Sequence, residues 1–336
     1  MARKADPLAG LDPAERELVR EAPMPGPFEP MKATLVDEPF SDPAWIFERK
    51  LDGVRALAFR DGDDARLFSR TKRAMHGYPE VVEGLQADEC SRFVLDGEVV
   101  ALVGNRTSFE RLQRRMQLAS GEAGRRTGVA IYLYVFDIVW LDGFDVRPLP
   151  LRSRKALLRS ALSLEDPIRF MTHRNERGEE LFKAACEMGL EGLIAKRAES
   201  PYVNRRTRDW LKLKCVNEQE LVIGGFTAPQ GSRTEFGALL VGYYEDGELR
   251  YAGKVGTGFN RDTLRSLGAA MRKLERDTPP FADVNPIPKG TRWIEPRLVA
   301  QIGFGEWTRD GRLRHPRFLG LRDDKRPEEV VRERPS

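Results

Sequence analysis

The sequence predicts an α+β protein of two domains, in which antiparallel sheets with flanking helices are followed by a small β-barrel. Short β-like runs begin at Trp45, and several of them end in Asp-Gly, as in antiparallel hairpins. Helical periodicity at residues 108–120 and 177–189 interrupts these runs. After Lys214 the chain reads as strand and turn with one helical insert at residues 261–277, which suits an OB-fold.

The chain is expected to fall into three segments: a charged leader at residues 1–25, a first domain at 26–216 and a second at 217–336. In the leader, Asp12 and Pro13 fit the N-cap and the first position of a short helix. We therefore expect the leader to be helical in part and to precede the first sheet.

Composition narrows the class of protein. The chain has 56 basic and 52 acidic residues, a net charge of +4, so binding to a polyanion requires clustered charge. Cys90, Cys186 and Cys215 form no CxxC pair, and we expect reduced thiols and no structural metal. No apolar run is long enough to span a membrane and the amino terminus is charged throughout, so we expect a cytoplasmic protein without membrane contact.

The segment from Glu48 to Arg55 carries the strongest chemical signal. Lys50 ends a β-like run and is followed by an Asp52-Gly53 turn, which directs its amine toward a cleft and lets the backbone approach a ligand. A lysine acts as a nucleophile only after losing its proton, and neighbouring cations and partial burial both favour that loss. The same pattern also fits an ordinary hairpin with a solvated lysine, so the decision rests on further segments.

Six further segments follow in a fixed order, and each supplies a group that a bound nucleotide needs. With Lys50–Arg55 as a KxDGxR motif, the chain resembles the covalent nucleotidyltransferase superfamily of DNA ligases, RNA ligases and mRNA capping enzymes. The other matching segments are Ser69–Thr71, Leu95–Glu98, Tyr134–Asp137, Glu191–Lys196, Trp210–Lys214 and Arg322–Lys325. Residues 249–259 and 313–325 make the resemblance most specific for the ligase domain of bacterial non-homologous end-joining ligases.

The resemblance implies an adenylation domain at residues 26–216 and an OB domain at 217–336, which together act as an ATP-dependent DNA ligase. Such an enzyme seals 5′-phosphate/3′-hydroxyl breaks in duplex DNA through a lysyl-AMP and a DNA-adenylate, here in double-strand break repair. Two alternatives stay open. One is another enzyme of the superfamily, an RNA ligase or a capping guanylyltransferase, and the other is a catalytically silent OB-containing DNA-binding protein.

The resemblance also implies roles around ATP. Lys50 attacks the α-phosphorus, Phe136 stacks on the purine, and Ile194 closes the other face of the purine. Glu98 and Glu191 are acids beside a polyanion, which makes chemical sense if Mg²⁺ or Mn²⁺ lies between them and the phosphates. Glu98 can instead accept the ribose hydroxyls.

The remaining nucleotide contacts come from several parts of the chain. Lys212 and Lys214 alternate along LKLK, so a strand presents both on one face, toward the α-phosphate. Glu48 points to the same side as Lys50 and is expected to contact adenine, with an exposed ion pair to an arginine as the competing interpretation. The full expected set of ATP-binding residues is Glu48, Arg55, Arg70, Glu98, Phe136, Ile194, Lys212, Lys214, Arg322, Asp324 and Lys325.

Arginines supply the expected DNA contacts. In the stretch 108–120, Phe109, Leu112 and Met116 share one face while the arginines project elsewhere. A ligase acts regardless of sequence, so these arginines are expected to bind phosphates rather than bases. The candidates are Arg111, Arg114, Arg115, Arg205, Arg206 and Arg208. The implied partner of this monomer is nicked or broken duplex DNA in the bacterial nucleoid, with Ku and a separate repair polymerase as accessory proteins.

Overall fold

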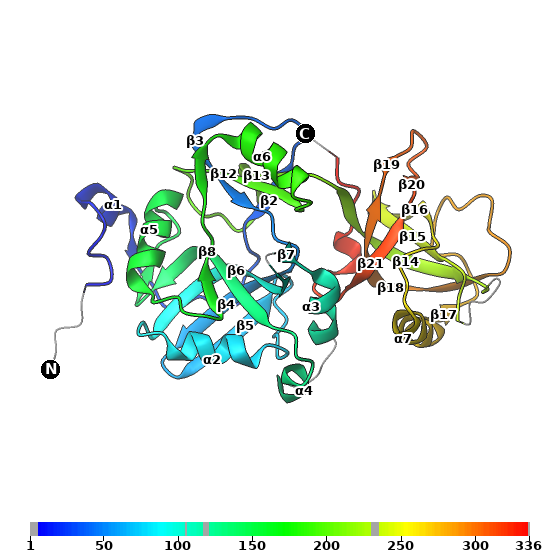
Figure 1. Ribbon diagram of the computed structural model, residues 1–336, viewed down its shortest axis with the longest axis horizontal. Helices are drawn as coiled ribbons and strands as arrows, with labels where there is room; N and C mark the ends of the chain where they lie inside the picture. The colour runs from blue at the N-terminus through cyan, green and yellow to red at the C-terminus, as the bar shows by residue number, and fades with distance from the viewer. Residues whose placement is uncertain (1–5, 105, 117–120, 230–234, 335–336) are drawn as a thin grey trace. The chain divides into compact units, whose positions relative to one another are not determined.

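The computed structural model describes residues 6–104, 106–116, 121–229 and 235–334, except for the side chains of Arg114 and Glu122. The chain divides into two compact units, with the boundary between Cys215 and Val216. Figure 1 shows the first unit in blue to green and the second in yellow to red. Each unit is described by itself.

Two sheets form the first unit. The larger one is eight-stranded, in the order β1-β9-β8-β6-β4-β5, with β10 added to β8 and β7 added to β6. Its strands are β1 (Arg20–Glu21), β4 (Val54–Asp61), β5 (Asp64–Ser69), β6 (Arg92–Val103), β7 (Arg106–Thr107), β8 (Ile131–Leu141), β9 (Phe144–Asp145) and β10 (Ile168–Phe170).

The smaller sheet is five-stranded, in the order β11-β3-β12-β13-β2. Its strands are β2 (Lys32–Leu35), β3 (Asp42–Arg49), β11 (Arg174–Glu176), β12 (Gly192–Arg197) and β13 (Arg206–Lys214). Most neighbours in the two sheets are antiparallel, as expected. The pairs β8/β10 and β2/β13 are parallel, and their strands are joined by the long connections that parallel pairing requires.

The two sheets and the helices of the first unit pack in layers, with hydrophobic side chains between the layers. The helices are α1 (Pro13–Leu18), α2 (Pro79–Ala87), α3 (Phe109–Met116), α4 (Gly121–Arg125), α5 (Leu151–Ala161) and α6 (Gly178–Glu187). One face of the larger sheet packs on α2, α3 and α5 through Val81, Leu112 and Leu158. Its other face meets the smaller sheet around Phe59 and Trp210. Helix α6 covers the outer face of the smaller sheet, so the two sheets enclose a shared interior.

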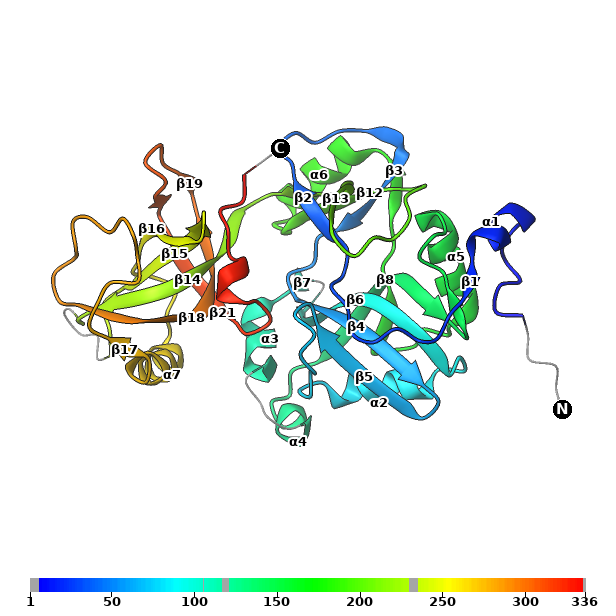
Figure 2. The same cartoon turned by 180° about the vertical axis from the view of Figure 1, so that it is seen from behind.

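The expected leader is not separate from the first unit in its described part, residues 6–25. Asp12 caps α1 in a reciprocal capping box with Glu15, which confirms the predicted helix start. Leu8 and Leu11, however, are buried in the main core, and β1 extends the larger sheet by pairing with β9. Figure 2 shows α1 and β1 beside α5.

The second unit is built on a long central strand. Its sheet runs β16-β15-β14-β18-β17, with β21 added to β18, and β19 and β20 form a separate pair. The elements are β14 (Asn217–Thr227), β15 (Leu239–Glu245), β16 (Glu248–Val255), α7 (Arg261–Arg272), β17 (Glu275–Arg276), β18 (Thr291–Phe304), β19 (Glu306–Trp307), β20 (Leu313–Arg314), β21 (Arg317–Arg322) and the 3₁₀ turn η1 (Pro327–Glu329). The helical insert expected in this part of the chain is α7, capped by Asn260. Among the described residues, no strand pairing closes this sheet into a full barrel.

The cysteines correct one expectation. Cys186 and Cys215 are joined by a disulfide, so the prediction of three reduced thiols is wrong, and only Cys90 is a free thiol. The two cysteines meet because Cys215 N donates to Glu191 O, which brings the end of β13 beside the segment after α6. A separation of 29 residues with no CxxC spacing gives no local signal for this pairing. In the described part of the chain, every helix is too short or too polar to cross a lipid bilayer.

Candidate active site

A tight turn after β3 positions Lys50. Lys50 N donates to Gly192 O on β12 at 2.9 Å, which holds the turn against the middle strand of the smaller sheet. Gly53 lies so close to β6 that a Cβ there would be 2.4 Å from Val99 O. Only glycine permits this approach, and the turn therefore brings the lysine to the interior between the two sheets.

The Lys50 amine pairs with a carboxylate. Its Nζ forms an ion pair with Glu191 Oε1, and the two side chains are 19% and 10% exposed. Burial disfavours the ammonium, but the carboxylates of Glu191, Glu98 and Asp52 outweigh burial and raise the pKa of Lys50. The expectation that neighbouring cations promote loss of its proton is therefore wrong, because the groups closest to the amine are acids.

Strand register brings the expected phosphate-binding lysines to the same region. On β12, Ile194 lies opposite Glu48 of β3 and Lys212 of β13, and Gly192 lies opposite Lys214. A Cβ at Gly192, whose φ is +142°, would be 1.9 Å from Leu213 O, so glycine is required there too. Lys212 and Lys214 are half-buried on one face of β13, while Leu211 and Leu213 are buried on the other.

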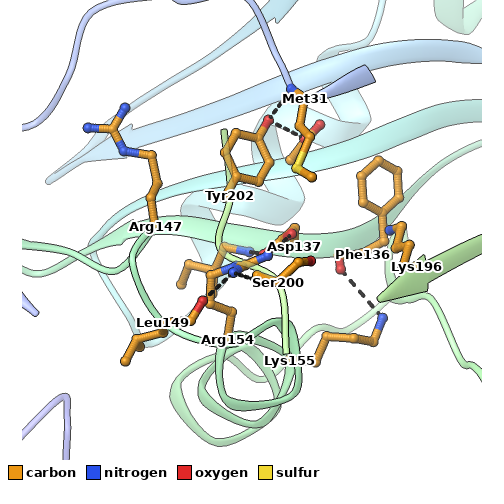
Figure 3. A network of polar contacts seen from close by, with 12 residues as sticks. Met31, Phe136, Asp137, Arg147, Leu149, Arg154, Lys155, Lys196, Ser200 and Tyr202 are labelled. Atoms are coloured by element: carbon orange, nitrogen blue, oxygen red, sulfur yellow. Dashed lines mark hydrogen bonds and ion pairs between the residues drawn. The ribbon is translucent and has the colours of Figure 1, made fainter. Parts of the chain in front are cut away.

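Arg55 lies on β4 of the larger sheet, in register with Glu98 on β6. Its guanidinium donates to both oxygens of Asp96 at 2.5 Å, and Tyr202 Oη donates to Asp96 Oδ2 at 2.6 Å. Asp96 is fully buried, so the arginine and the tyrosine supply the polar partners that its carboxylate needs. Figure 3 shows Tyr202 meeting Met31, whose backbone N–H donates to the same hydroxyl.

A β-bulge sets the position of Phe136. The β6/β8 register places Asp96 opposite Asp137 and Gly97 opposite Val135, so Phe136 is the extra residue of β8. Phe136 is 7% exposed, and its ring lies edge-to-face with Trp210 at a centroid distance of 6.0 Å. Arg55 lies 4.6 Å from the ring centroid and Lys196 lies 4.0 Å from it.

Glu48 lies in the interior of the unit rather than on its surface. It is 3% exposed and lies between two buried lysines, with Lys155 Nζ 2.5 Å from Oε1 and Lys196 Nζ 2.7 Å from Oε2. The exposed arginine pair is therefore wrong. Sequence reasoning gave neither lysine a position. Period-two alternation puts Lys196 on the same face of β12 as Ile194, whereas the segment around Lys155 carries no such signal.

Asp137 has a buried arginine as its partner. Arg154 on α5 donates to Asp137 Oδ1 at 2.7 Å and to Oδ2 at 2.9 Å, and both side chains are 0% exposed. Arg154 also donates to Leu149 O and Ser200 O, as Figure 3 shows. Sequence reasoning gave Asp137 and Asp96 no individual role and did not identify the arginine.

A pocket of about 400 Å³ opens beside the lysine turn. Arg49 and Leu51, which flank Lys50, line one side of it, and Tyr134 of β8 and Met171 line another. None of the expected ATP-binding residues lines this pocket, although Glu48, Lys50 and Phe136 are each one or two residues from its walls.

Glu98 and Glu191 suit a divalent cation that takes its remaining ligands from phosphate and water. Glu191 Oε2 is buried and accepts no hydrogen bond within the described residues. No group of three or more His, Cys, Asp or Glu side chains with metal-binding spacing occurs in the described part of the chain. One or two carboxylates with phosphate and water oxygens is the ligand set that Mg²⁺ prefers, so Glu191 and Glu98 suit such an ion.

The expected DNA-binding arginines separate by exposure. Arg111, Arg205, Arg206 and Arg208 are exposed, whereas the side chain of Arg114 lies outside the described residues. Arg115 is 1% exposed and donates to both oxygens of Glu80, at 2.7 and 2.8 Å. Its assignment to DNA is therefore wrong, because its guanidinium is used to join α3 to α2.

The other expected residues lie at two places. Arg70 is half-buried directly after β5, beside the buried Ser69 and Thr71. In the second unit, Arg322 donates twice to Asp324 at 2.8 Å, and Lys325 lies 3.0 Å from Glu220.

Comparison with known proteins gives the family. Residues 30–214 match the model described as "ATP dependent DNA ligase domain", and residues 232–325 match "ATP dependent DNA ligase C terminal region". The fold is that of a nucleotidyltransferase domain followed by an OB-type domain, as expected. The chain belongs to the ATP-dependent DNA ligase family.

Individual relatives refine the match. The chain is 37% identical over 325 residues to the multifunctional non-homologous end joining protein LigD of Pseudomonas aeruginosa, covering 94% of this chain and 38% of that protein. It is 38% identical over 300 residues to LigD of Mycobacterium tuberculosis, covering 86% and 37%. The chain thus spans about two fifths of the length of these curated relatives.

A solved structure supports the same relationship. The chain resembles a mycobacterial DNA ligase D complexed with ATP and MES, with a TM-score of 0.64 and 35% sequence identity. The match covers 91% of this chain and 98% of that chain. The predicted resemblance to the ligase domain of end-joining ligases is confirmed.

Proposed function

We propose that this chain is a DNA ligase that uses ATP to seal 5′-phosphate/3′-hydroxyl breaks in duplex DNA. The observation that carries the proposal is the partly buried amine of Lys50, aimed between the two sheets by the Gly53 turn and paired with Glu191. A lysine amine between two sheets is well placed to form a covalent bond to a nucleotide bound there. Because the chain belongs to the ATP-dependent DNA ligase family, ATP is the proposed nucleotide.

The reaction begins when the Lys50 amine, after losing a proton, attacks the α-phosphorus of ATP. A phosphoramide bond forms and pyrophosphate leaves. The AMP group then passes to the 5′-phosphate of the DNA, and the 3′-hydroxyl attacks that phosphate and releases AMP. Lys212 and Lys214, on one face of β13, stabilise the negative charge that grows on the α-phosphate.

Other residues of the first unit bind the nucleoside. Phe136 and Ile194 contact the two faces of the purine, and Glu48 contacts its edge. Arg55 and Arg70 reach toward the sugar from β4 and from the end of β5. Their positions around the shared interior support these roles, since β3, β4, β8 and β12 all contribute to it.

Glu98 and Glu191 hold Mg²⁺ or Mn²⁺ in this proposal. Such an ion, when bound, neutralises phosphate charge and helps pyrophosphate to depart. Glu191 would then be shared between the ion and the Lys50 amine, which would weaken the interaction that favours the protonated amine.

The second unit contributes Arg322, Asp324 and Lys325. We assign them to the departing pyrophosphate, whose negative charge two cationic side chains suit. The partners proposed for the monomer are broken duplex DNA, Ku and a separate repair polymerase, in double-strand break repair in the bacterial nucleoid. The similarity to LigD, named for non-homologous end joining, supports this context.

The decisive experiment follows covalent loading and then product formation. Purified protein is incubated with a divalent cation and α-labelled ATP or GTP, and its intact mass is measured. We expect an AMP adduct with ATP, which then disappears as nicked DNA is sealed. GTP loading or an RNA-only product would favour the capping or RNA-ligase alternative, and absence of any adduct would favour a silent DNA-binding protein.

Removal of exposed arginines should weaken DNA binding without changing the chemistry on ATP. Arg205→Ala/Arg208→Ala is expected to lower affinity for nicked duplexes of any sequence, and to reduce the slope of log affinity against log salt by about 0.9 per arginine. Fluorescence anisotropy at several salt concentrations measures both quantities. Arg66→Ala/Arg177→Ala removes the same charge from exposed sites elsewhere on the unit and serves as the control. An equal loss in the control would contradict a localised DNA contact.

A further inference from the structure

Lys155 on α5 is a buried cation that none of the sequence motifs includes. Its side chain is 2% exposed, and its Nζ lies 2.5 Å from Glu48 Oε1, 3.1 Å from Met171 O and 3.4 Å from Phe136 O. An ammonium group has three N–H donors, so these three acceptors use all of them. Figure 3 shows the bond to the Phe136 carbonyl.

The three acceptors of Lys155 belong to different walls of the site. Glu48 is on β3 of the smaller sheet, and Phe136 is the bulged residue of β8 in the larger sheet. Met171 follows β10 and lines the pocket of about 400 Å³ beside the lysine turn. One side chain from α5 therefore ties together the two sheets and one wall of this pocket.

Lys196 balances the same carboxylate from the other side. It lies 2.7 Å from Glu48 Oε2 and rests on the rings of Phe136 and Trp210, at 4.0 and 4.1 Å from their centroids. Burial, together with the like charge of Lys155, outweighs Glu48 and lowers the pKa of Lys196 to about 8. Lys155 thus influences both of the other charges in this cluster.

Loss of Lys155 has a defined local consequence. Glu48 would keep Lys196 as its one close cation and would be free to turn toward it. The carbonyls of Phe136 and Met171 would lose a buried donor, which weakens the bulge that aims the Phe136 ring. Both changes act on groups that contact a purine rather than on the amine that reacts.

From this geometry we infer that Lys155 is a positioning residue for purine binding, which fixes the Glu48 carboxylate and the Phe136 backbone. The inference rests on the ATP-binding role proposed above for these two residues. It assigns to α5 a part in nucleotide recognition in addition to its packing against the larger sheet.

Three variants of the full chain test this role: Lys155→Met, Lys155→Arg, and Arg159→Met as the matched control. Arg159 is exposed one turn further along α5 and lies over the Phe170 ring, as Lys155 does, so its removal takes away the same charge and a similar ring contact but none of the three hydrogen bonds of Lys155. Initial rates of protein–AMP formation are measured against ATP concentration, together with thermal melting. We expect Lys155→Met to raise KM for ATP about 10- to 100-fold with kcat within about threefold of the original, which marks lost ground-state binding. Lys155→Arg should recover most of the loss, and Arg159→Met should change neither constant.

A double-mutant cycle keeps the inference testable even where Lys155→Met folds poorly. Glu48→Gln/Lys155→Met removes both charges, so it is compared with Glu48→Gln alone. If Lys155 acts through Glu48, the second substitution should raise KM by less than about threefold. Additive effects, or an unchanged KM in Lys155→Met, would overturn the inference while leaving the ligase proposal intact. A wild-type protein that forms no AMP adduct would instead refute the ligase proposal itself.

Discussion

Lys50→Ala is expected to eliminate self-adenylation, with a fall in rate of at least about a thousandfold. The alanine variant lacks the nucleophile, and no other lysine in the described residues combines the Gly53 turn with an ion pair to Glu191. Intact mass after incubation with ATP and a divalent cation measures the loss directly. Lys50→Arg should be equally inactive because a guanidinium stays protonated and cannot attack phosphorus.

The same variant separates the steps of the proposed reaction. Joining a DNA strand that already carries 5′-AMP needs no lysyl-AMP, so Lys50→Ala should still seal pre-adenylated nicks. Lys183→Ala, an exposed lysine on α6, is the matched control and should load AMP normally. An AMP adduct of full yield in Lys50→Ala would place the nucleophile elsewhere and refute the assignment.

Arg154→Met is expected to destabilise the first unit by about 3–5 kcal/mol, because it leaves the Asp137 carboxylate buried without its counter-ion. Both side chains are 0% exposed, so solvent does not compensate for the loss. Arg154 also donates to the carbonyls of Leu149 and Ser200, which would lose their donor. For a unit of this size the melting temperature should fall by roughly 10 °C or more, as measured by calorimetry or circular dichroism.

A second substitution distinguishes the charge effect from lost packing. Asp137→Leu combined with Arg154→Met replaces the whole ion pair by apolar side chains, and part of the lost stability should return. Arg159→Met on the exposed face of the same helix is the control and should melt like the original protein. If Arg154→Met melts unchanged, the buried pair does not stabilise the unit.

Local patterns in the sequence correctly predicted several elements of the fold. Asp12 and Pro13 marked the start of α1, and the apolar face of Phe109 and Leu112 identified α3. The LKLK alternation placed Lys212 and Lys214 on one face of a strand. Each of these features depends on residues a few positions apart, so short-range periodicity and capping are sufficient to predict them.

Sequence by itself determined the family and the order of the two units, and it singled out Lys50 as the candidate nucleophile, because all three depend on motifs and on their order along the chain. Only the tertiary structure decided which charges are buried and what they contact. Arg115 looks like a surface cation in its helix but binds Glu80, and Glu48 is paired by Lys155 from a helix 107 residues away. Partners so far apart in sequence leave no local pattern. A charged side chain is buried only where an oppositely charged partner replaces its contacts with water, and only the tertiary structure brings that partner close.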